Sequence, residues 1–394
     1  MPWKETSSVT ERMSFIVDYL KKEHSVAELC RHYGMPQKTG YKWIARWNES
    51  CGDPTSLLDR SRAPRSCPHA MSSAMGRMIM DARRQHPRWG PLKLLAVLRE
   101  RHPKVEKWPA PSSVGALLKR HGLALPRKPR PKATPSSMPF GSCDHPGDTW
   151  AMDFKGQWQV SDGRMCYPLT VSDLATRYLI RVQALENQRT APVEAILVGA
   201  FREHGLPLRI RSDNGPPFAT TTLAGLSRLS VKLMLLGIEH ERIVPGRPQQ
   251  NGSHERMHRT LKQEVTARPQ ARSLIAQQRD FDEIVQEFNY VRPHQALGLI
   301  PPARLYVPSA RPYPEILPTP EYPGAQWVVN VAECGEFRWR GSKIYLSKAL
   351  GGQPVGLVAD PADERYLQIW FCQTPIGRLE IKTKQVRQAV EMPS

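Results

Sequence analysis

Apolar residues in the first part of the chain recur at the spacing of helices. In residues 13–20, MSFIVDYL, they share one face of a first helix. Ser25 and Glu28 form a Ser-x-x-Glu capping box that begins a second helix, and Gly34 ends it. A third helix is expected over residues 37–48. A short helix, a glycine-containing turn and a longer helix predict a helix-turn-helix.

The third helix has two different faces. Ile44 and Trp47 are expected to face inward. Three short amphipathic helices also form ordinary bundles, so DNA binding and simple packing are both open for this motif taken alone. The outward face carries polar, basic and aromatic side chains suited to phosphates and base edges, namely Gln37, Lys38, Thr39, Tyr41, Lys42 and Arg46.

A second set of helical patterns follows over residues 72–85, 91–101 and 112–121. We interpret it as a second small DNA-binding module, and a helical spacer with solvated charges is the alternative. Basic residues are expected on its outer faces, at Lys93, Arg99, Arg101, Lys119 and Arg120.

The apolar pattern then changes from the helical period to the alternation of strands. Three strands, over 149–157, 165–172 and 178–184, are separated by connections short enough for antiparallel hairpins. Three antiparallel strands followed by alternating helices and strands predict a mixed α/β sheet covered on both faces. The later elements are a helix over 191–204, a strand over 208–211, a helix over 221–236, a strand over 238–244 and a helix over 253–266.

Short strands separated by Gly or Pro fill residues 326–384 and predict a small SH3-like β-barrel. A basic, aromatic face could contact DNA, and a purely structural β module is the alternative. That face comprises Arg338, Trp339, Arg340, Lys343 and Lys348.

Two Pro-rich stretches separate these parts and predict extended linkers. The predicted segments are a helix-turn-helix domain over 1–60, a second helical module over 61–124, a basic linker over 125–146, a catalytic core over 147–307, a second linker over 308–324 and a β-barrel over 325–394.

Charge narrows the class of partner. The 394 residues include 56 Lys and Arg against 37 Asp and Glu, a net charge of +19. Such an excess favours a polyanionic partner, because neutralising phosphates releases counterions. The sequence contains no run of about 18 apolar residues, so a membrane span is not expected. The seven Cys are scattered without a C-x-x-C pair, which fits a reducing cytosol and argues against a zinc ribbon.

Three acidic residues occupy positions where chemistry is expected. Asp153 lies among apolar neighbours in the first strand, where a carboxylate is costly unless it is paired or bound to metal. Asp213 follows the strand over 208–211 at its carboxyl end, and Glu255 lies in the first turn of the last helix. If the first strand and the strand before Asp213 are neighbours, the three carboxylates converge at one edge of the sheet.

Clustered carboxylates repel one another unless a cation neutralises them. Oxygen ligands favour Mg²⁺ or Mn²⁺, and two such ions about 4 Å apart promote phosphodiester displacement. The competing acids Asp162 and Asp173 lie at expected hairpin turns and are interpreted as turn formers.

A different metal pattern overlaps the last helix. His254, Glu255 and His258 spell H-E-x-x-H, which in metalloproteases places two zinc-binding His on one helix face. The basic charge and the helix-turn-helix argue against a protease, although His294 could be proposed as a third ligand.

Three segments, WAMDFKG, RSDNGPPF and PGRPQQNGSHERMHRTLK, resemble the signature motifs of insertion-sequence transposases that share the retroviral-integrase catalytic core. FNYVRPHQALGLIPPARLY, at 288–306, resembles the segment that closes that core in bacterial members. The resemblance covers about residues 148–306 strongly and the helix-turn-helix region more loosely. The interval from Asp213 to Glu255 is longer than in many relatives.

The resemblance implies an RNase H-like fold and a DDE triad of Asp153, Asp213 and Glu255 that holds two Mg²⁺ ions. It also implies nicking at the inverted-repeat ends of a mobile element and attack of the free 3′-OH on target DNA. We therefore expect a bacterial-type, cytoplasmic, nucleoid-associated transposase that binds double-stranded DNA and assembles as a multimer on it.

Polar and basic neighbours of the triad are further candidates for DNA contact. The alternatives are surface salt bridges for the basic residues and helix capping for the residues before the helix. The candidates are Asn214, Gln250, Asn251, Arg256, Arg259 and Lys262.

Two other functions remain open on these residues. A helix-turn-helix regulator would bind DNA without chemistry, and Asp153 and Asp213 would be dispensable. An RNase H-like nuclease would cut DNA with the same triad and metals but would not join it.

Overall fold

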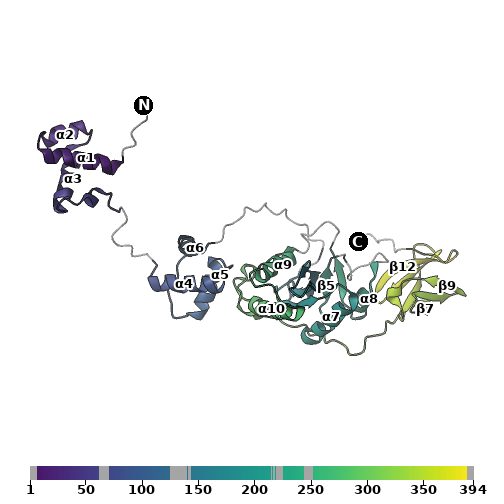
Figure 1. Cartoon of the computed structure of the whole chain (residues 1–394). Coiled ribbons are helices and arrows are strands. Elements are labelled where there is room, and N and C mark those ends of the chain that lie inside the picture. The colour runs from purple at the N-terminus through teal and green to yellow at the C-terminus, as the bar shows by residue number, and fades with distance from the viewer. Residues whose placement is uncertain are drawn as a thin grey trace. The chain divides into compact units, whose positions relative to one another are not determined.

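The computed structural model describes residues 7–61, 71–124, 140, 143–213, 215, 218, 225–243 and 252–387. The chain divides into two compact units, Met1–Ser72 and Ser73–Ser394 (Figure 1). In the part of the chain described, no helix has the length and apolar character needed to cross a membrane.

The first unit contains the predicted helix-turn-helix, as helices α1 (Ser8–Lys21), α2 (Val26–His32) and α3 (Gln37–Glu49) and a 3₁₀ turn at Pro54–Leu57. The capping box is present, because the Ser25 amide donates to the Glu28 carboxylate and the Glu28 amide donates to the Ser25 hydroxyl. Ile44 is buried as predicted, but the buried tryptophan is Trp43 and Trp47 is only half-buried. The helical period therefore located α3 and its inner face, on which Trp47 packs against the core one turn after the more deeply buried Trp43.

The second unit begins with three helices, α4 (Ser73–Gln85), α5 (Pro91–Arg101) and α6 (Pro111–Arg120). These bounds agree with the predicted helical module. Nδ1 of His86 lies 3.0 Å from a carboxylate oxygen of Glu287, which belongs to the segment over 147–307. Lys93 was expected on an outer face, but this prediction was wrong, since the side chain is half-buried in a cavity lined by residues of that segment.

A six-stranded mixed sheet follows, with order β2-β3-β1-β5-β6 and β4 paired to β3. β1 pairs antiparallel with β3 and parallel with β5, and β5 pairs parallel with β6. The predicted neighbourhood of the first strand and the strand before Asp213 is thus confirmed. The strands are β1 (Thr149–Phe154), β2 (Trp158–Gln159), β3 (Met165–Asp173), β4 (Leu179–Leu185), β5 (Arg209–Ser212) and β6 (Glu239–Arg242).

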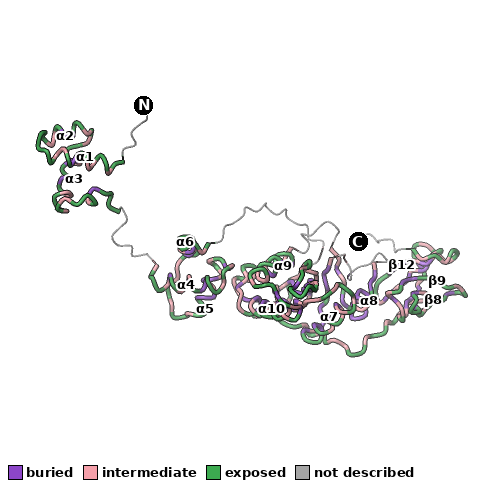
Figure 2. Tube along the Cα trace, viewed as in Figure 1, coloured by how far each residue is buried: buried purple, intermediate pink, exposed green. Residues whose placement is uncertain are grey.

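Helices cover both faces of this sheet, and Figure 2 shows buried residues in the region of α7, α8 and α10. On one face α7 (Thr190–His204) and α8 (Arg228–Leu235) pack through residues such as Phe201 on Trp150 and its neighbours. On the other face lie α9 (Gly252–Val265) and α10 (Leu274–Gln286). The fold is therefore the predicted RNase H-like arrangement with a mixed sheet.

The segment after α10 closes the sheet. α10 continues into a π-helical turn at Glu287–Val291. Within that turn the buried Asn289 accepts from the Leu179 amide at 2.8 Å and donates to the Leu179 carbonyl at 2.9 Å. These two bonds satisfy the backbone at the start of β4 in place of another strand.

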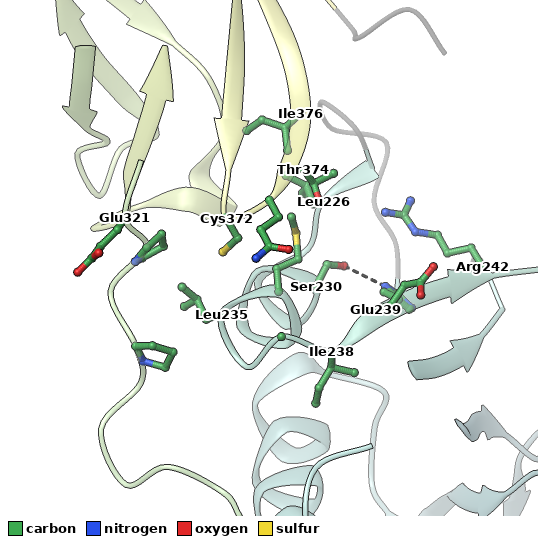
Figure 3. A pocket seen from close by; sticks show the side chains of 16 residues that line it. Leu226, Ser230, Leu235, Ile238, Glu239, Arg242, Glu321, Cys372, Thr374 and Ile376 are labelled. Atoms are coloured by element: carbon green, nitrogen blue, oxygen red, sulfur yellow. Dashed lines mark hydrogen bonds between the residues drawn. The ribbon is translucent and has the colours of Figure 1, made fainter. Parts of the chain in front are cut away.

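The C-terminal part is all β, as predicted. A five-stranded antiparallel sheet has the order β13-β12-β11-β10-β7, and β8 and β9 form a separate hairpin, while closure into an SH3-like barrel stays a prediction. Its apolar core includes Leu226, Val231 and Leu235 at and beside α8, with a cavity of about 790 Å³ beside this junction (Figure 3). The strands are β7 (Trp327–Asn330), β8 (Glu336–Trp339), β9 (Ser342–Tyr345), β10 (Pro354–Ala359), β11 (Tyr366–Phe371), β12 (Thr374–Glu380) and β13 (Val386–Arg387).

The second Pro-rich stretch contains no helix or strand, as predicted, but it is bonded to the core rather than free. The Ser309 amide donates to the His204 carbonyl, and the Arg311 guanidinium donates to the Pro207 and Leu236 carbonyls at 2.7 and 2.8 Å. Gly205, with φ of 73°, lets this stretch approach, because a Cβ there would lie 2.3 Å from the Ser309 carbonyl oxygen.

Replacement of Arg311 should therefore loosen the core. We expect Arg311→Ala to lower the free energy of unfolding by about 2 kcal/mol, because several backbone carbonyls lose a charged donor. Arg202→Ala is the matched control, since Arg202 is exposed, pairs with Glu315 at 3.0 Å, lies over the Tyr313 ring and donates to no backbone carbonyl among the described residues. Equal losses for the two variants in urea unfolding would contradict this role of Arg311.

Candidate active site

The sheet places the first two predicted carboxylates side by side. In the parallel register of β1 with β5, Trp150 lies opposite Ile210 and Ala151 opposite Arg211. Continued by two residues, this register puts Asp153 opposite Asp213, which directly follows β5. Neighbouring strands lie about 5 Å apart, so the two carboxylates can share a ligand.

The alternation of β1 determines which face Asp153 occupies. Side chains of consecutive strand residues point to opposite faces. Met152 belongs to the core beneath α7 and α8, so Asp153 points toward α9. Its partner on the antiparallel strand β3 is Thr170.

Thr170 connects Asp153 to two buried histidines of α9. Its hydroxyl donates to the Asp153 carbonyl at 2.9 Å. A hydroxyl has one proton, so it must accept from Nε2 of His254 at 2.8 Å and from Nε2 of His258 at 2.6 Å. The Ser172 hydroxyl lies 2.8 Å from Nδ1 of His254 and donates to it in this arrangement. Both histidines are thereby fixed as the Nε2–H tautomer.

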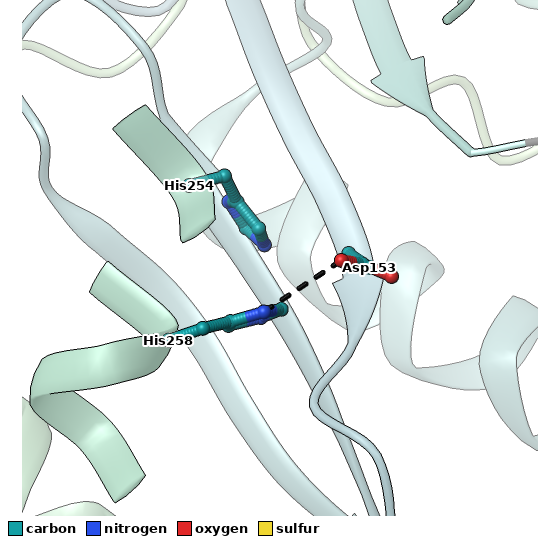
Figure 4. Close-up of side chains that lie close together, drawn as sticks. All are labelled: Asp153, His254 and His258. Atoms are coloured by element: carbon teal, nitrogen blue, oxygen red, sulfur yellow. Dashed lines mark ion pairs between the residues drawn. The ribbon is translucent and has the colours of Figure 1, made fainter. Parts of the chain in front are cut away.

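This arrangement leaves one ring nitrogen toward the carboxylate. Nδ1 of His258 lies 3.6 Å from Oδ2 of Asp153 (Figure 4). Burial lowers the pKa of His254 to about 3 and that of His258 to about 2, so both rings are neutral at neutral pH. The neutral rings bond to Thr170 and Ser172 of β3, the strand next to that of Asp153, without adding a charge to the site.

The alternative H-E-x-x-H metal site fits this geometry less well. Asp153, His254 and His258 each offer a ligand atom within 4.8 Å of the others. Both nitrogens of His254, however, already bond to hydroxyls, and a zinc ligand needs a free nitrogen lone pair. Glu255, the general base of that pattern, is exposed while both histidines are buried.

The pKa of Asp153 responds to the charges of the other two carboxylates, Asp213 and Glu255. Burial, then the charge of Asp213 and, more weakly, that of Glu255 raise the pKa of Asp153 to about 7. Burial also raises the pKa of Asp213, against the Gly215 amide that donates to its Oδ1 at 3.2 Å. The site thus concentrates negative charge that a cation would relieve.

The predicted DNA-contact residues fall into three groups. In α3, Lys38, Tyr41 and Lys42 are exposed, whereas Thr39 and Arg46 are half-buried. The candidates Asn214, Gln250 and Asn251 lie outside the described residues. In α9 three exposed cations form no ion pair with any described residue, which favours a role other than surface salt bridging, and these are Arg256, Arg259 and Lys262.

The two competing acids are turn formers, as predicted. Asp162 accepts from the Arg164 amide at 3.0 Å within the β2–β3 hairpin. Asp173 is buried, and its carboxylate accepts from the Thr176 amide at 2.8 Å in the turn before β4. Their oxygens are thus occupied by backbone amides and by side chains of the same turns, Arg164 for Asp162 and Thr176 for Asp173.

Sequence reasoning did not identify Thr170 and Ser172 as parts of the site. The hairpin between the first two long strands was predicted, but its register was not. A pairing of Asp153 with Thr170 would have followed from that register. Their hydroxyls give no distinctive signal in the sequence.

The raised pKa of Asp153 predicts a pH-dependent cost to stability. Its folded-state pKa of about 7 exceeds the ordinary 3.8, so the stability that goes with the protonated carboxyl is full below about pH 4 and is lost as the pH rises through 7, above which the cost of the buried charge is full. In EDTA at pH 8 we expect Asp153→Asn to have a higher melting temperature than the wild type and a free energy of unfolding larger by on the order of 2 kcal/mol. Both gains should shrink at pH 5.

Asp162→Asn is the control for this measurement. Hydrogen bonds from Arg164 lower the pKa of Asp162, so its replacement should bring no gain at pH 8. A stability of Asp153→Asn equal to that of the wild type at both pH values would refute the burial of an ionised Asp153.

Family profiles match most of the chain. The description "Integrase core domain" matches residues 144–248 and, in a second profile, 236–302. A helix-turn-helix domain matches residues 11–65 and a homeodomain-like domain residues 39–118. Residues 326–387 match the C-terminal domain of IS481 family transposases.

Individual relatives include insertion-element and viral proteins. An uncharacterized protein of insertion element IS476 from Xanthomonas euvesicatoria is 29% identical over 60% of this chain and 66% of its own length. One of element IS407 from Burkholderia multivorans is 27% identical over 48% of this chain and 60% of its own length. The chain thus spans about two thirds or less of these relatives. The Gag-Pol polyprotein of baboon endogenous virus is 42% identical over 20% of the chain and 4% of that polyprotein.

Solved structures with some likeness are retroviral integrases. The intasome of simian T-cell lymphotropic virus, with a PP2A regulatory subunit, aligns with 80% of this chain and 99% of its own at 17% identity and a TM-score of 0.35. The HTLV-2 integrase core with magnesium aligns with 41% and 97% at 16% identity and a TM-score of 0.32. The profiles show that the chain carries helix-turn-helix, integrase core and IS481-type C-terminal domains, which confirms its resemblance to insertion-sequence transposases with a retroviral-integrase-type core.

Proposed function

We propose that this protein is a DNA transposase that nicks the inverted-repeat ends of a mobile element and joins the free 3′-OH to target DNA. The observation that carries the proposal is the parallel pairing of β1 with β5, which puts Asp153 beside Asp213. The charge of Glu255 on α9 also acts on Asp153. The integrase core and helix-turn-helix profiles support the same reaction class.

Asp153, Asp213 and Glu255 are the residues that would hold Mg²⁺, with Mn²⁺ as a substitute. The donor set fits, because it consists of carboxylate oxygens, and burial followed by their mutual repulsion raises the pKa of Asp153. Bound there, two cations would supply Lewis-acid activation of the attacking oxygen and stabilisation of the leaving oxygen.

The remaining residues position the reacting groups. The Thr170 hydroxyl holds the Asp153 backbone carbonyl, and the neutral rings of His254 and His258 donate to that hydroxyl. Arg256 and Arg259, which are exposed on the helix that carries Glu255, would hold DNA phosphates against the site. The exposed residues of α3 would recognise the element ends in the major groove.

Loss of one carboxylate should abolish chemistry and spare DNA binding. With Mg²⁺ and a labelled element-end duplex, we expect joined products from the wild type and none from Asp213→Asn, a loss of at least about 10³-fold. Asp162→Asn makes the same chemical change at a hairpin turn and should leave joining intact. Light scattering of the DNA complex should give at least two chains, because joining two ends requires two active sites.

Other outcomes select the alternative functions. Metal-dependent cleavage without joined DNA would assign a nuclease. Tight binding of the duplex without cleavage, unchanged by Asp213→Asn, would overturn the enzyme and assign a regulator. A DNA complex with the mass of one chain would contradict assembly.

A further inference from the structure

A small basic cavity lies beside the proposed triad, and none of Asp153, Asp213 and Glu255 lines it. Its volume is about 160 Å³. Its walls come from α5, the turn between β3 and β4, α9 and the segment after α10. Residues that matter for its chemistry are Lys93, Arg177, Arg256, Arg292, Ser253 and His294.

Positive charge dominates this lining. Four of the lining residues are cations, and Arg292 alone has a carboxylate partner, Glu264, at 3.1 Å. Among the described residues, Lys93, Arg177 and Arg256 form no ion pair. Asp173 also lines the cavity, but its carboxylate already accepts three hydrogen bonds, from the Gly147 amide and from the Thr176 amide and hydroxyl.

The cations are held there against electrostatic cost. Burial, followed by the charge of Arg292, lowers the pKa of Lys93 to about 8. Burial, followed by the charge of Arg256, also lowers the pKa of Arg177. A stable fold gains nothing from gathering like charges in a partly buried space, so an anion that neutralises them explains the arrangement.

Backbone and polar features point to the same cavity. Arg177 adopts φ of 66°, a conformation that non-glycine residues rarely adopt. Phe288 lines the cavity from within the π-helical turn after α10, and such turns are frequent at functional sites. Nε2 of His294 is buried and has no hydrogen-bond partner among the described residues.

The cavity also adjoins the start of α9. Ser253 and Arg256 lie in the first turns of that helix, on either side of Glu255. The first turn of a long helix attracts anions through its free amides and dipole. An anion bound here would therefore lie within a turn or two of a proposed catalytic carboxylate.

We propose that this cavity binds one phosphate group of a DNA strand, gripped jointly by Lys93 of the second helical module and by Arg177, Arg256 and Arg292 of the core. Sites for drug-sized ligands occupy roughly 300–1,000 Å³, so a cavity of about 160 Å³ fits a phosphate rather than a base or nucleoside. The proposal rests on the transposase function and adds that the second helical module helps to hold the strand at the active site.

Salt dependence of DNA binding tests the joint grip. Each phosphate neutralised contributes about 0.9 to the slope of log affinity against log salt. With full-length protein and a labelled element-end duplex, we expect Lys93→Gln and Arg256→Gln each to lower that slope by up to about 0.9. The double variant should also lose about 0.9 and not about 1.8, because both residues serve one phosphate.

Lys93→Gln combined with Lys343→Gln is the matched control, since Lys343 is exposed on the β8–β9 hairpin, away from the cavity lining. Losses in this pair should add. Thermal unfolding of Lys93→Gln checks that this variant folds. Because Lys93 is half-buried and unpaired among the described residues, the melting temperature should be unchanged or higher than that of the wild type.

Several results would overturn the phosphate site. One is an unchanged slope for Lys93→Gln in protein that still joins DNA, which would leave the transposase function intact. Another is additive losses for Lys93→Gln and Arg256→Gln. A third is stabilisation by inorganic phosphate, at fixed ionic strength, that Lys93→Gln abolishes while the DNA slope stays unchanged, since this would assign the cavity to a free anion.

Discussion

The parallel pairing of β1 with β5 is the contact on which the proposed chemistry depends. It joins a hairpin-rich half of the sheet, built from β1 to β4, to a half in which strands and helices alternate. Asp153 lies within the first half and Asp213 directly after a strand of the second. A slip of one residue in this register would move Asp153 away from Asp213, so the two halves must fold together before the site exists.

The same pairing carries an electrostatic cost, because it brings two carboxylates together in a partly buried site. Two carboxylates on neighbouring strands repel each other, and burial raises the pKa of Asp153 to about 7. Thr170 bonds to the backbone of Asp153 and the two neutral histidines of α9 bond to Thr170, so these residues order the site without neutralising it. The repulsion that destabilises the site without a cation also gives the site affinity for a cation.

Much of the fold followed from the sequence because its signals were local. Helical period located α3 and α5, the capping box located the start of α2, and strand alternation located β1 and β3. Side-chain placement that depends on packing between segments could not be predicted in this way. Lys93 was assigned to an outer face because the period of α5 does not reveal that a distant segment covers it. Thr170 was missed because strand register is a tertiary property.

The most direct test of the account is a titration of the full-length protein with Mn²⁺, followed by the electron paramagnetic resonance signal of the free ion. If the three carboxylates hold the metal, Asp213→Asn weakens Mn²⁺ binding by about tenfold or more, because a ligand of the ion is lost, and His258→Gln weakens it less. Retention of Mn²⁺ binding by Asp213→Asn together with its loss in His258→Gln would contradict the account and assign the metal to Asp153 and the two histidines.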